Sequence, residues 1–374
     1  MSDKAGQSAT IPNAIFKAMG PPGSPSIERD LAATGIAATQ IRRMNLNESP
    51  YPPSAQAIAA MQAACSTVNY YPDPKWRDLV AAISGETGIA ENRIVLGNGS
   101  DELIVNAGKI ALNPGDEMLV PVPSFPGYDK SAEINQAALV RVPVRQDGAP
   151  DVDAMAAAIT DKTRIVYCAT PNNPTGGLIG TAELERLSQA VPASALFIVD
   201  EAYYEFGRHA GGDDHLQMLQ ARQGPWVSFR TFSKAFGLAG IRVGYALCGS
   251  DDLANAFQQA RSVFNVNAVA QAAALAALRD PDHTQWILTQ TAEERRRLDA
   301  GLRRLGCRPF PSVGNFIAAA TDRPAADIVA ALAARGIMIS RLMAPGYQDY
   351  LRITVSTADD TDALLAALSD ILAA

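Results

Sequence analysis

The sequence contains few of the residues on which metal sites and hydrolytic triads depend. Its 374 residues include four cysteines and three histidines, and their spacing matches neither a metal knuckle nor a disulfide scaffold. The histidines, His209, His215 and His283, stand outside any Ser-His-Asp or zinc pattern. We therefore predict no metal site, and we expect neither zinc hydrolysis nor Ser-His-Asp catalysis.

Basic tracts and long apolar runs are also missing. Lys and Arg number 32 against 39 Asp and Glu, which gives a net charge of −7. Nucleic acid and anionic membranes are therefore poor partners. No apolar run reaches the ~18 residues of a membrane span, and residues 1–16 lack a basic start followed by an apolar core. These absences predict a protein that stays in the cytoplasm.

What is present is the alternating pattern of an α/β protein. Hydrophobic residues make up 48% of the chain, which is enough for a large core and roughly two domains. Apolar runs alternate with helical patterns from residue 42 onward, which predicts a doubly covered, mostly parallel sheet. The expected strands are 93–97, 117–120, 138–143, 164–168, 195–199, 226–230 and 242–248.

The two ends of the chain differ from this pattern. A short helical pattern over 26–34 among turn residues predicts an N-terminal arm. Residues 271–304 are alanine-rich and charged on one side, as expected of one long helix that joins two domains. Later apolar runs with intervening helices predict a smaller α+β domain. The predicted division is an arm (1–41), a large domain (42–270) and a small domain (271–374).

One lysine stands among small residues in the segment Arg230-Thr-Phe-Ser-Lys-Ala-Phe-Gly-Leu-Ala-Gly-Ile-Arg242. An amine that forms a Schiff base must lose its charge near neutral pH, and small neighbours admit a flat ring. Lys234 is the candidate amine, and Arg242 is the candidate cation for a phosphate. Thr231 and Ser233 would support the phosphate or orient the lysine. Taken alone, either basic residue could equally be a solvated surface side chain.

A Gly-rich turn, Gly97-Asn-Gly99-Ser100-Asp101, follows the first expected strand and opens a helical pattern. Backbone N–H groups at a helix N-terminus bind phosphate well. Gly99 would allow close approach, and Ser100 and Asp101 are candidate donors to phosphate oxygens. An ordinary turn capped by Ser100 or Asp101 explains the segment about as well. A nicotinamide site is disfavoured because the full Gly-x-Gly-x-x-Gly pattern is missing.

Two further strands end in polar side chains. One runs into Thr170-Pro-Asn-Asn173-Pro-Thr-Gly, a rigid turn that can hold the Asn173 amide still. The next delivers Asp200, which could keep a pyridine nitrogen protonated, or could instead cap a helix. Tyr203 would reach a phenolic oxygen of the same ring. Open α/β sheets bind ligands at this edge. Glu201 and Glu205 are expected to be solvated or to support their neighbours.

In this order, these segments resemble the class I/II (fold type I) pyridoxal-phosphate aminotransferases. The chain is most similar to the histidinol-phosphate aminotransferases, through Leu46-Asn-Glu-Ser-Pro, Tyr71-Pro-Asp-Pro and Leu351-Arg-Ile-Thr-Val-Ser-Thr. The resemblance runs from about residue 46 to about residue 357. It implies pyridoxal 5′-phosphate on Lys234, a homodimer with shared active sites, and transfer of an amino group between an amino donor and a 2-oxo acid such as 2-oxoglutarate.

The resemblance also implies further site residues. Arg352 would bind the substrate α-carboxylate. An unpaired guanidinium is costly among apolar strand neighbours, and the carboxylate would pair with it. Phe125 would stack on the ring, with core packing as the alternative. Tyr71 would reach the phosphate across a dimer interface, and there it could also contact substrate. The alternative is that Tyr71 packs beside Trp76. Asn173 would contact both the cofactor's phenolic oxygen and the substrate.

The chain departs from the family at one position. The histidinol-phosphate enzymes have an arginine for the substrate phosphate where this chain has Ser340, and Arg341 follows. A one-residue slip in a strand turns a side chain to the other face. Arg341 stays a candidate substrate-binding residue. Histidinol phosphate stays the favoured amino donor, and an aromatic or other amino acid is the alternative donor. A decarboxylase of the threonine-phosphate type shares nearly all these residues, and a non-catalytic effector-binding module is a remote alternative.

Overall fold

The computed structural model describes residue 11, residues 14–19, residue 30 and residues 35–373. Most of the expected N-terminal arm, with most of the helical pattern over 26–34, lies outside the described residues. Within them the arm contributes α1 (Ala14–Ala18) and the short 3-10 helix η1 (Ala38–Gln40).

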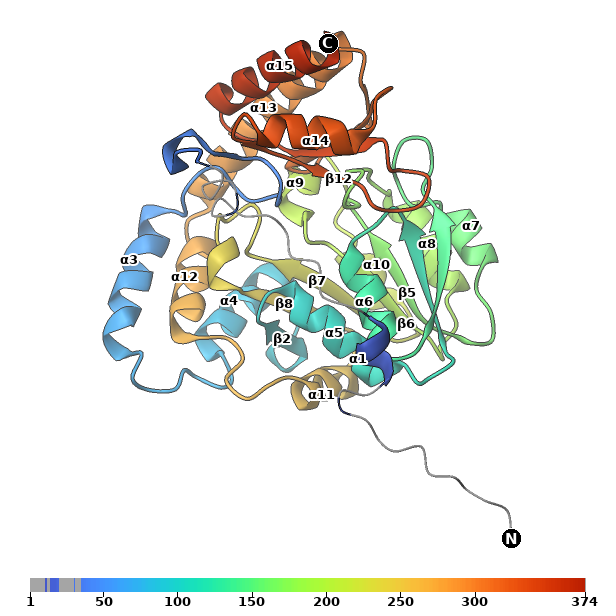
Figure 1. Cartoon of the computed structure of the whole chain (residues 1–374). Helices are drawn as coiled ribbons and strands as arrows, with labels where there is room; N and C mark the ends of the chain where they lie inside the picture. The colour runs from blue at the N-terminus through green and yellow to red at the C-terminus, as the bar shows by residue number, and fades with distance from the viewer. Residues whose placement is uncertain (1–10, 12–13, 20–29, 31–34, 374) are drawn as a thin grey trace.

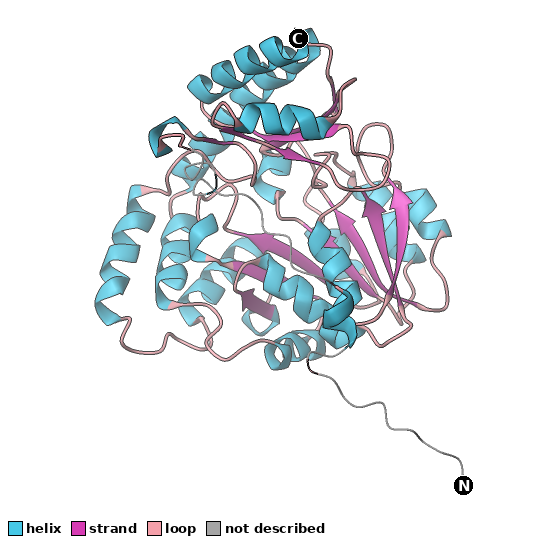
Figure 2. Cartoon of the chain, viewed as in Figure 1, coloured by secondary structure: helices cyan, strands magenta, loops and turns pink. Residues whose placement is uncertain are grey.

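A seven-stranded sheet forms the centre of the larger part of the molecule (Figures 1 and 2). The strand order is β2-β8-β7-β6-β5-β3-β4. β8 is antiparallel to both of its neighbours, and the other pairs are parallel. The strands are β2 (Ile94–Gly97), β3 (Glu117–Val122), β4 (Ala138–Pro143), β5 (Thr163–Ala169), β6 (Leu196–Asp200), β7 (Trp226–Thr231) and β8 (Gly244–Cys248). Each coincides with an expected strand, and the predicted α/β fold class is confirmed.

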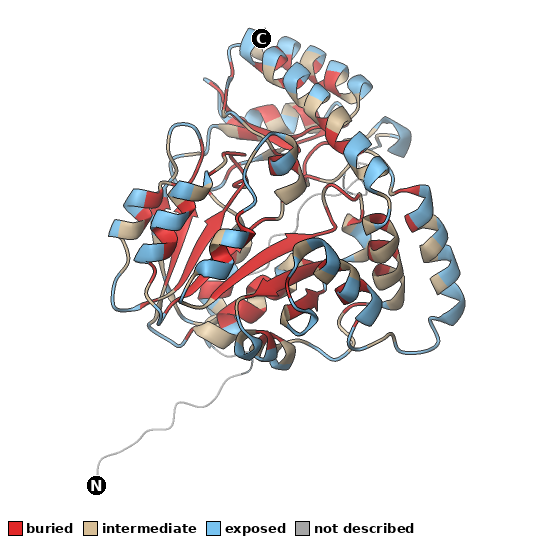
Figure 3. Cartoon of the chain, turned by 180° about the vertical axis from the view of Figure 1, so that it is seen from behind, coloured by how far each residue is buried: buried red, intermediate tan, exposed pale blue. Residues whose placement is uncertain are grey.

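Helices cover both faces of this sheet. Figure 1 shows α5 and α6 in front of it, and Figure 3 shows other helices over the opposite face, with the buried strands between the layers. The helices are α3 (Ala55–Ala64), α4 (Arg77–Thr87), α5 (Ser100–Ala111), α6 (Pro126–Ile134), α7 (Val152–Ala157), α8 (Thr181–Ala190), α9 (Tyr204–His209), α10 (Leu216–Ala221), α11 (Asp251–Ala260) and α12 (Ala268–Leu278). Short 3-10 helices occur at η2 (Cys65–Thr67), η3 (Glu91–Arg93) and η4 (Ala239–Ile241).

The strands of the sheet centre are buried along their whole length because both of their faces are covered, and most of their residues are apolar. Every residue of β6 and β7 is buried. Asp200 and Thr231, the last residues of these two strands, are therefore polar side chains delivered from a rigid core to its carboxyl edge. The candidate site is therefore built on the ends of fully buried strands.

A second hydrophobic core lies in the C-terminal part of the chain. Its antiparallel sheet has the order β12-β13-β10-β9, and β1 pairs in parallel with β11 beside it. The elements are β1 (Arg42–Arg43), β9 (Arg308–Pro309), β10 (Phe316–Ala320), β11 (Ile337–Met338), β12 (Ser340–Arg341), β13 (Tyr350–Thr354), α13 (Pro281–Arg304), α14 (Ala325–Ala333) and α15 (Ala358–Ala373). The division at residues 41 and 270 stays a prediction, although residues 42–44 pack with this second core.

The prediction of one long helix over residues 271–304 is wrong. α12 ends at Leu278, and α13 begins at Pro281 after Asp280, whose side chain accepts a hydrogen bond from the His283 N–H. Proline at the first helical position has no N–H to pair and cannot continue a preceding helix, so Asp-Pro starts a new one. α13 contributes Leu288 to the larger core and Leu298 to the smaller one.

Among the described residues, no helix is both long and apolar enough to cross a membrane.

Candidate active site

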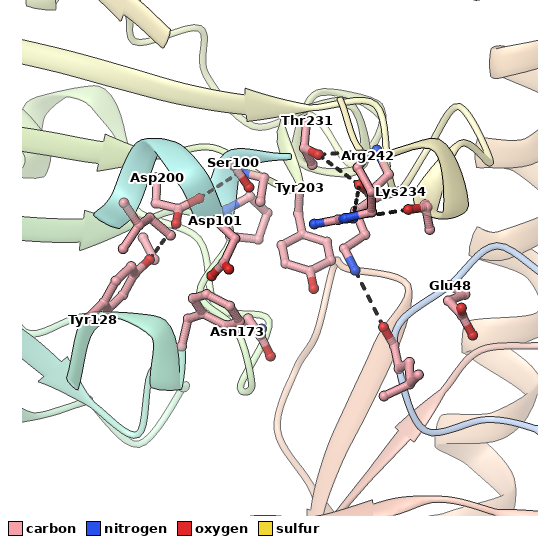
Figure 4. Close-up of a pocket in the computed structure, with 18 residues that line it drawn as sticks. Glu48, Ser100, Asp101, Tyr128, Asn173, Asp200, Tyr203, Thr231, Lys234 and Arg242 are labelled. Carbon is pink, nitrogen blue, oxygen red and sulfur yellow. Dashed lines mark hydrogen bonds between the residues drawn. The ribbon is translucent and has the colours of Figure 1, made fainter. Parts of the chain in front are cut away.

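The carboxyl ends of β5, β6 and β7 border a cavity of about 460 Å³ (Figure 4). It lies at the edge where open α/β sheets bind ligands. The predicted site residues that line it are Ser100, Asp101, Phe125, Asn173, Asp200, Tyr203, Thr231, Ser233, Lys234 and Arg242. Segments that are far apart in the sequence thus meet around one space.

Lys234 lies on the turn after β7, and its amine points into the cavity beside Tyr203 (Figure 4). Nζ donates to the carbonyl oxygen of Asn47 at 3.0 Å and lies 3.4 Å from that of Leu46. Burial, followed by the positive charges of Arg352 and Arg242, lowers the pKa of Lys234 to about 8. Roughly a tenth of the amine is therefore neutral, and nucleophilic, at pH 7, which is far more than in an ordinary lysine.

Asp200 is held in an apolar pocket at the end of β6. Its Oδ2 accepts a 2.6 Å hydrogen bond from the Tyr128 hydroxyl, and its Oδ1 accepts one from the Ala202 N–H. Burial raises the pKa of Asp200, and these hydrogen bonds oppose the rise. The carboxylate does not cap a helix, since α9 begins four residues later at Tyr204. Such a fixed carboxylate can hold a proton on a ring nitrogen.

The N-terminus of α5 forms a cup with the arginine that follows the lysine. Gly99 precedes the helix with φ 75°, and a Cβ there would collide with Nη2 of Arg242. Arg242 donates to the Ala239 carbonyl at 3.0 Å and contacts the Ser233 hydroxyl at 3.5 Å, and Thr231 donates to Ser233. Helix N–H groups, hydroxyls and a guanidinium around one small space fit a phosphate group.

Arg352, on β13, is not among the residues that line the cavity, but it contacts Asn173, which is. Nη1 donates to Asn173 Oδ1 at 3.2 Å and Nη2 donates to the Asn45 carbonyl at 2.8 Å, but the buried Nε has no partner among the described residues. An unsatisfied charged N–H is costly unless a ligand accepts from it. A carboxylate or phosphate oxygen of a substrate would do so.

Ser340 is the cross-strand partner of Arg352, and its hydroxyl donates to the Asn45 carbonyl at 2.9 Å. Arg341 instead pairs with Leu351 and is exposed. It is not among the residues that line the cavity, so a contact of Arg341 with substrate stays a prediction that this arrangement does not favour. The physical reason is the two-residue period of a strand, which points neighbours to opposite faces.

Tyr71 lies outside this cavity. Its side chain is 81% exposed and stacks on Phe264, with ring centroids 4.4 Å apart. It is not stacked on Trp76, over whose ring the Arg261 guanidinium lies. A contact of Tyr71 with a partner's phosphate site stays a prediction. Phe125 lines the cavity and makes a T-shaped contact with Tyr128, and stacking of Phe125 on a ligand ring stays a prediction.

Comparison with known proteins decides the family. Residues 39–368 match the model of "Aminotransferase class I and II". The chain belongs to this family. It is 38% identical over 339 residues to histidinol-phosphate aminotransferase 2 of Carboxydothermus hydrogenoformans, which covers 90% of this chain and 91% of that one. It is 35% identical over 339 residues to histidinol-phosphate aminotransferase 1 of Mesorhizobium japonicum, with 90% and 92% covered.

A solved structure shows the same fold over the whole length. The histidinol-phosphate aminotransferase of Sinorhizobium meliloti, in complex with pyridoxal-5′-phosphate, superposes with a TM-score of 0.89 at 27% identity and covers 99% of both chains. The predicted aminotransferase and its fold type are thereby confirmed. Class I and II aminotransferases use pyridoxal phosphate, and the amine, the carboxylate and the phosphate cup of this chain fit that group.

Three residues of this aminotransferase's site were not assigned from the sequence. Tyr128 holds Asp200, Asn47 contacts Tyr203 and Lys234, and Glu48 lines the cavity while accepting from Arg43 at 2.7 Å. The local sequence around Tyr128 and Asn47 does not predict their partners, which lie 72 to 187 residues away.

Replacing Gly99 by alanine is expected to weaken cofactor binding by roughly tenfold or more, because the added methyl displaces the Arg242 guanidinium from the cup. The measurement is the dissociation constant of pyridoxal phosphate from the cofactor-depleted protein. Gly115→Ala is the matched control, since Gly115 also has positive φ but has nothing within 4 Å of a Cβ. Equal weakening in both variants would mean that backbone strain, and not the cup, is responsible.

Proposed function

We propose that this chain is a pyridoxal-phosphate-dependent aminotransferase that moves an amino group from histidinol phosphate to 2-oxoglutarate. The observation that carries the chemistry is the buried Lys234 amine, with its lowered pKa, in one cavity with Asp200 and the phosphate cup. The amine would bind the cofactor covalently and then carry a proton to and from the substrate Cα. When bound, the cofactor supplies a ring that accepts the electrons of a substrate carbanion.

The other side chains of the site would hold and orient the cofactor and the substrate. Asp200 would keep a proton on the ring nitrogen, while Tyr203 and Asn173 would hold the phenolic oxygen. Arg352 would receive the anionic group of the donor and then that of the 2-oxo acid, using the Nε that has no partner in the described part of the chain. Phe125 would stack on the ring. These positions favour a flat, anionic ligand that lies between the sheet edge and β13.

Histidinol phosphate is proposed as donor because the curated relatives at 35% and 38% identity carry that name. Ser340 supports a second candidate, an aromatic or other amino acid. Its hydroxyl is engaged by the Asn45 carbonyl and adds no positive charge to the anion site. Arg352, beside Asn173, would then be the cation that receives the substrate anion, and one guanidinium matches a carboxylate well.

A homodimer is part of this proposal. The stacked rings of Tyr71 and Phe264 have exposed neighbours in the sequence, Tyr70 and Val263, which are 73% and 75% exposed. Clustered exposed aromatics of this kind favour a protein interface. We further propose that the enzyme acts in the cytoplasm, as the composition predicts. Sedimentation of the purified protein would measure its oligomeric state.

The experiment that tests the function is a visible spectrum of the purified enzyme with each amino donor added separately. A band in the range of roughly 410–430 nm is expected for the bound cofactor. Loss of the band with histidinol phosphate, and also with glutamate because it is the product that 2-oxoglutarate would give, but not with phenylalanine, is the expected result. Loss with phenylalanine and not with histidinol phosphate would favour the second candidate donor. Release of CO₂ would instead identify a decarboxylase, and no band after addition of cofactor would contradict the proposal.

A further inference from the structure

Asn47 makes more contacts with the site than any role assigned to it explains. The residue is buried, with 1% of its surface exposed, and has φ 53°, in the left-handed region that asparagine tolerates. Leu46 and Glu48 line the cavity on either side of it. The Asn47 side chain instead reaches the hydroxyl of Tyr203, and its carbonyl accepts from the Lys234 amine.

The hydrogen bonds around Asn47 determine which way its amide faces. The backbone N–H of Asn47 donates to Thr354 Oγ1 at 2.9 Å, so the threonine hydroxyl has its own proton free to donate. That proton goes to Asn47 Oδ1 at 3.3 Å. With Oδ1 turned toward Thr354, Nδ2 faces Tyr203 at 2.9 Å. Both groups of the amide are thereby fixed.

This arrangement determines the direction of the Tyr203 hydroxyl. An amide NH₂ can only donate, so the Tyr203 oxygen accepts from Asn47 and must direct its own proton elsewhere. Tyr203 lines the cavity, and its proton is therefore available to a ligand there. The bond from Asn47 also opposes the effect of burial, which raises the pKa of Tyr203 to about 12.

The same segment reaches the substrate arginine. Thr354 and Arg352 are two residues apart on β13 and so share a face, and Arg352 donates to the carbonyl of Asn45. The segment 45–47 therefore touches the anion-binding arginine at one end and the lysine and tyrosine at the other. We propose that Asn47 is a positioning residue that fixes Tyr203 as a hydrogen-bond donor toward the cavity and links this setting, through Thr354, to the strand that binds the substrate anion.

The inference rests on the proposed function, and Asn47→Asp tests it. Aspartate keeps the size and the left-handed tolerance of asparagine, but its carboxylate only accepts, so the Tyr203 proton turns away from the cavity. We expect kcat to fall by about tenfold with KM changed by less than about twofold, since one hydrogen bond to the reacting site is lost while Arg352 is intact. The new negative charge should also raise the pKa of Lys234 by about one unit in the cofactor-free protein.

Two further variants separate orientation from charge. Asn47→Gly suits the positive φ and keeps the carbonyl that Lys234 uses, so kcat should fall while the lysine pKa stays near its original value. Thr354→Val removes the hydroxyl that orients the amide and should lower kcat in the same direction. Asn106→Asp is the control, because it places a carboxylate at another buried asparagine, on α5. It should lower stability and leave the lysine pKa unchanged.

The lysine pKa is read from the pH dependence of Lys234 acetylation in the cofactor-free protein, followed by mass spectrometry. The proposal is overturned if Asn47→Asp and Asn47→Gly both keep kcat within about twofold of the original enzyme, or if the lysine pKa does not move in Asn47→Asp. The proposed function fails separately, by the absence of a visible band in the unaltered protein. The acetylation measurement needs no bound cofactor, so the two failures are distinguishable.

Discussion

The Lys234→Ala variant is expected to lose the visible band of the bound cofactor and to turn over more slowly by a factor on the order of 10⁴ or more. The reason is that one amine both anchors the cofactor and moves the proton at the substrate Cα. Among the described residues, no other lysine lines the cavity that could replace it. The measurements are the absorption spectrum and the single-turnover rate with amino donor.

Lys109→Ala is the control, since Lys109 lies on α5 and its amine donates to the Asn106 side chain. It should keep both the band and the turnover. The pH dependence adds a quantitative check. Because the pKa of Lys234 is about 8, its acetylation rate should rise about tenfold per pH unit below that value and level off above it. A rise that continues to about pH 10 would show an ordinary lysine and contradict the assigned role.

The Arg230→Met variant is expected to lose about 3–5 kcal/mol of unfolding free energy. Arg230 Nε donates to Glu201 Oε2 at 2.9 Å, and the two side chains are 4% and 2% exposed. The guanidinium also lies over the Tyr204 ring, 3.5 Å from its centroid. Removing the cation leaves Glu201 charged in the core with only the Ser228 hydroxyl donating to it. Denaturant unfolding of the cofactor-free protein measures the loss.

Two comparisons make this prediction specific. Arg303→Met removes an exposed partner of Asp299 on α13 and should change the unfolding midpoint little. The double variant Arg230→Met with Glu201→Leu replaces both charges by apolar groups and should recover much of the loss. A single variant as stable as the original protein would show that the buried Arg230–Glu201 pair does not contribute to stability as expected.

Most of the fold could be predicted because its signals are local. The seven expected strands agree with the observed ones to within a few residues, since each is a short apolar run bounded by turn residues. Lys234 and Arg242 could be found for the same reason, as one loop carries both. Asp200 was found because a strand buried on both faces leaves an acid little room except at its end.

The predictions fail or stop where the structure depends on contacts between residues far apart in the sequence, or on one residue that interrupts a local pattern. The Asp280-Pro281 pair divides what the alanine-rich pattern predicted as one helix. Glu201 is buried, and its role follows from an arginine on the neighbouring strand that the sequence does not connect to it. Asn47 could not be assigned because its partners, Tyr203 and Thr354, lie 156 and 307 residues away. Arg341 stays a predicted substrate residue, although its position next to Ser340 on β12 argues against it.

Trp286 gives this molecule an optical probe of its own. Of the three tryptophans, Trp76 and Trp226 are buried, whereas Trp286 on α13 is 45% exposed. Its ring meets that of Tyr51 at 4.8 Å, and the Tyr51 carbonyl lies against Gly237, three residues after Lys234. A collisional quencher in solution therefore reaches chiefly Trp286. The quenching then reports on the contact between α13 and the loop that carries Lys234.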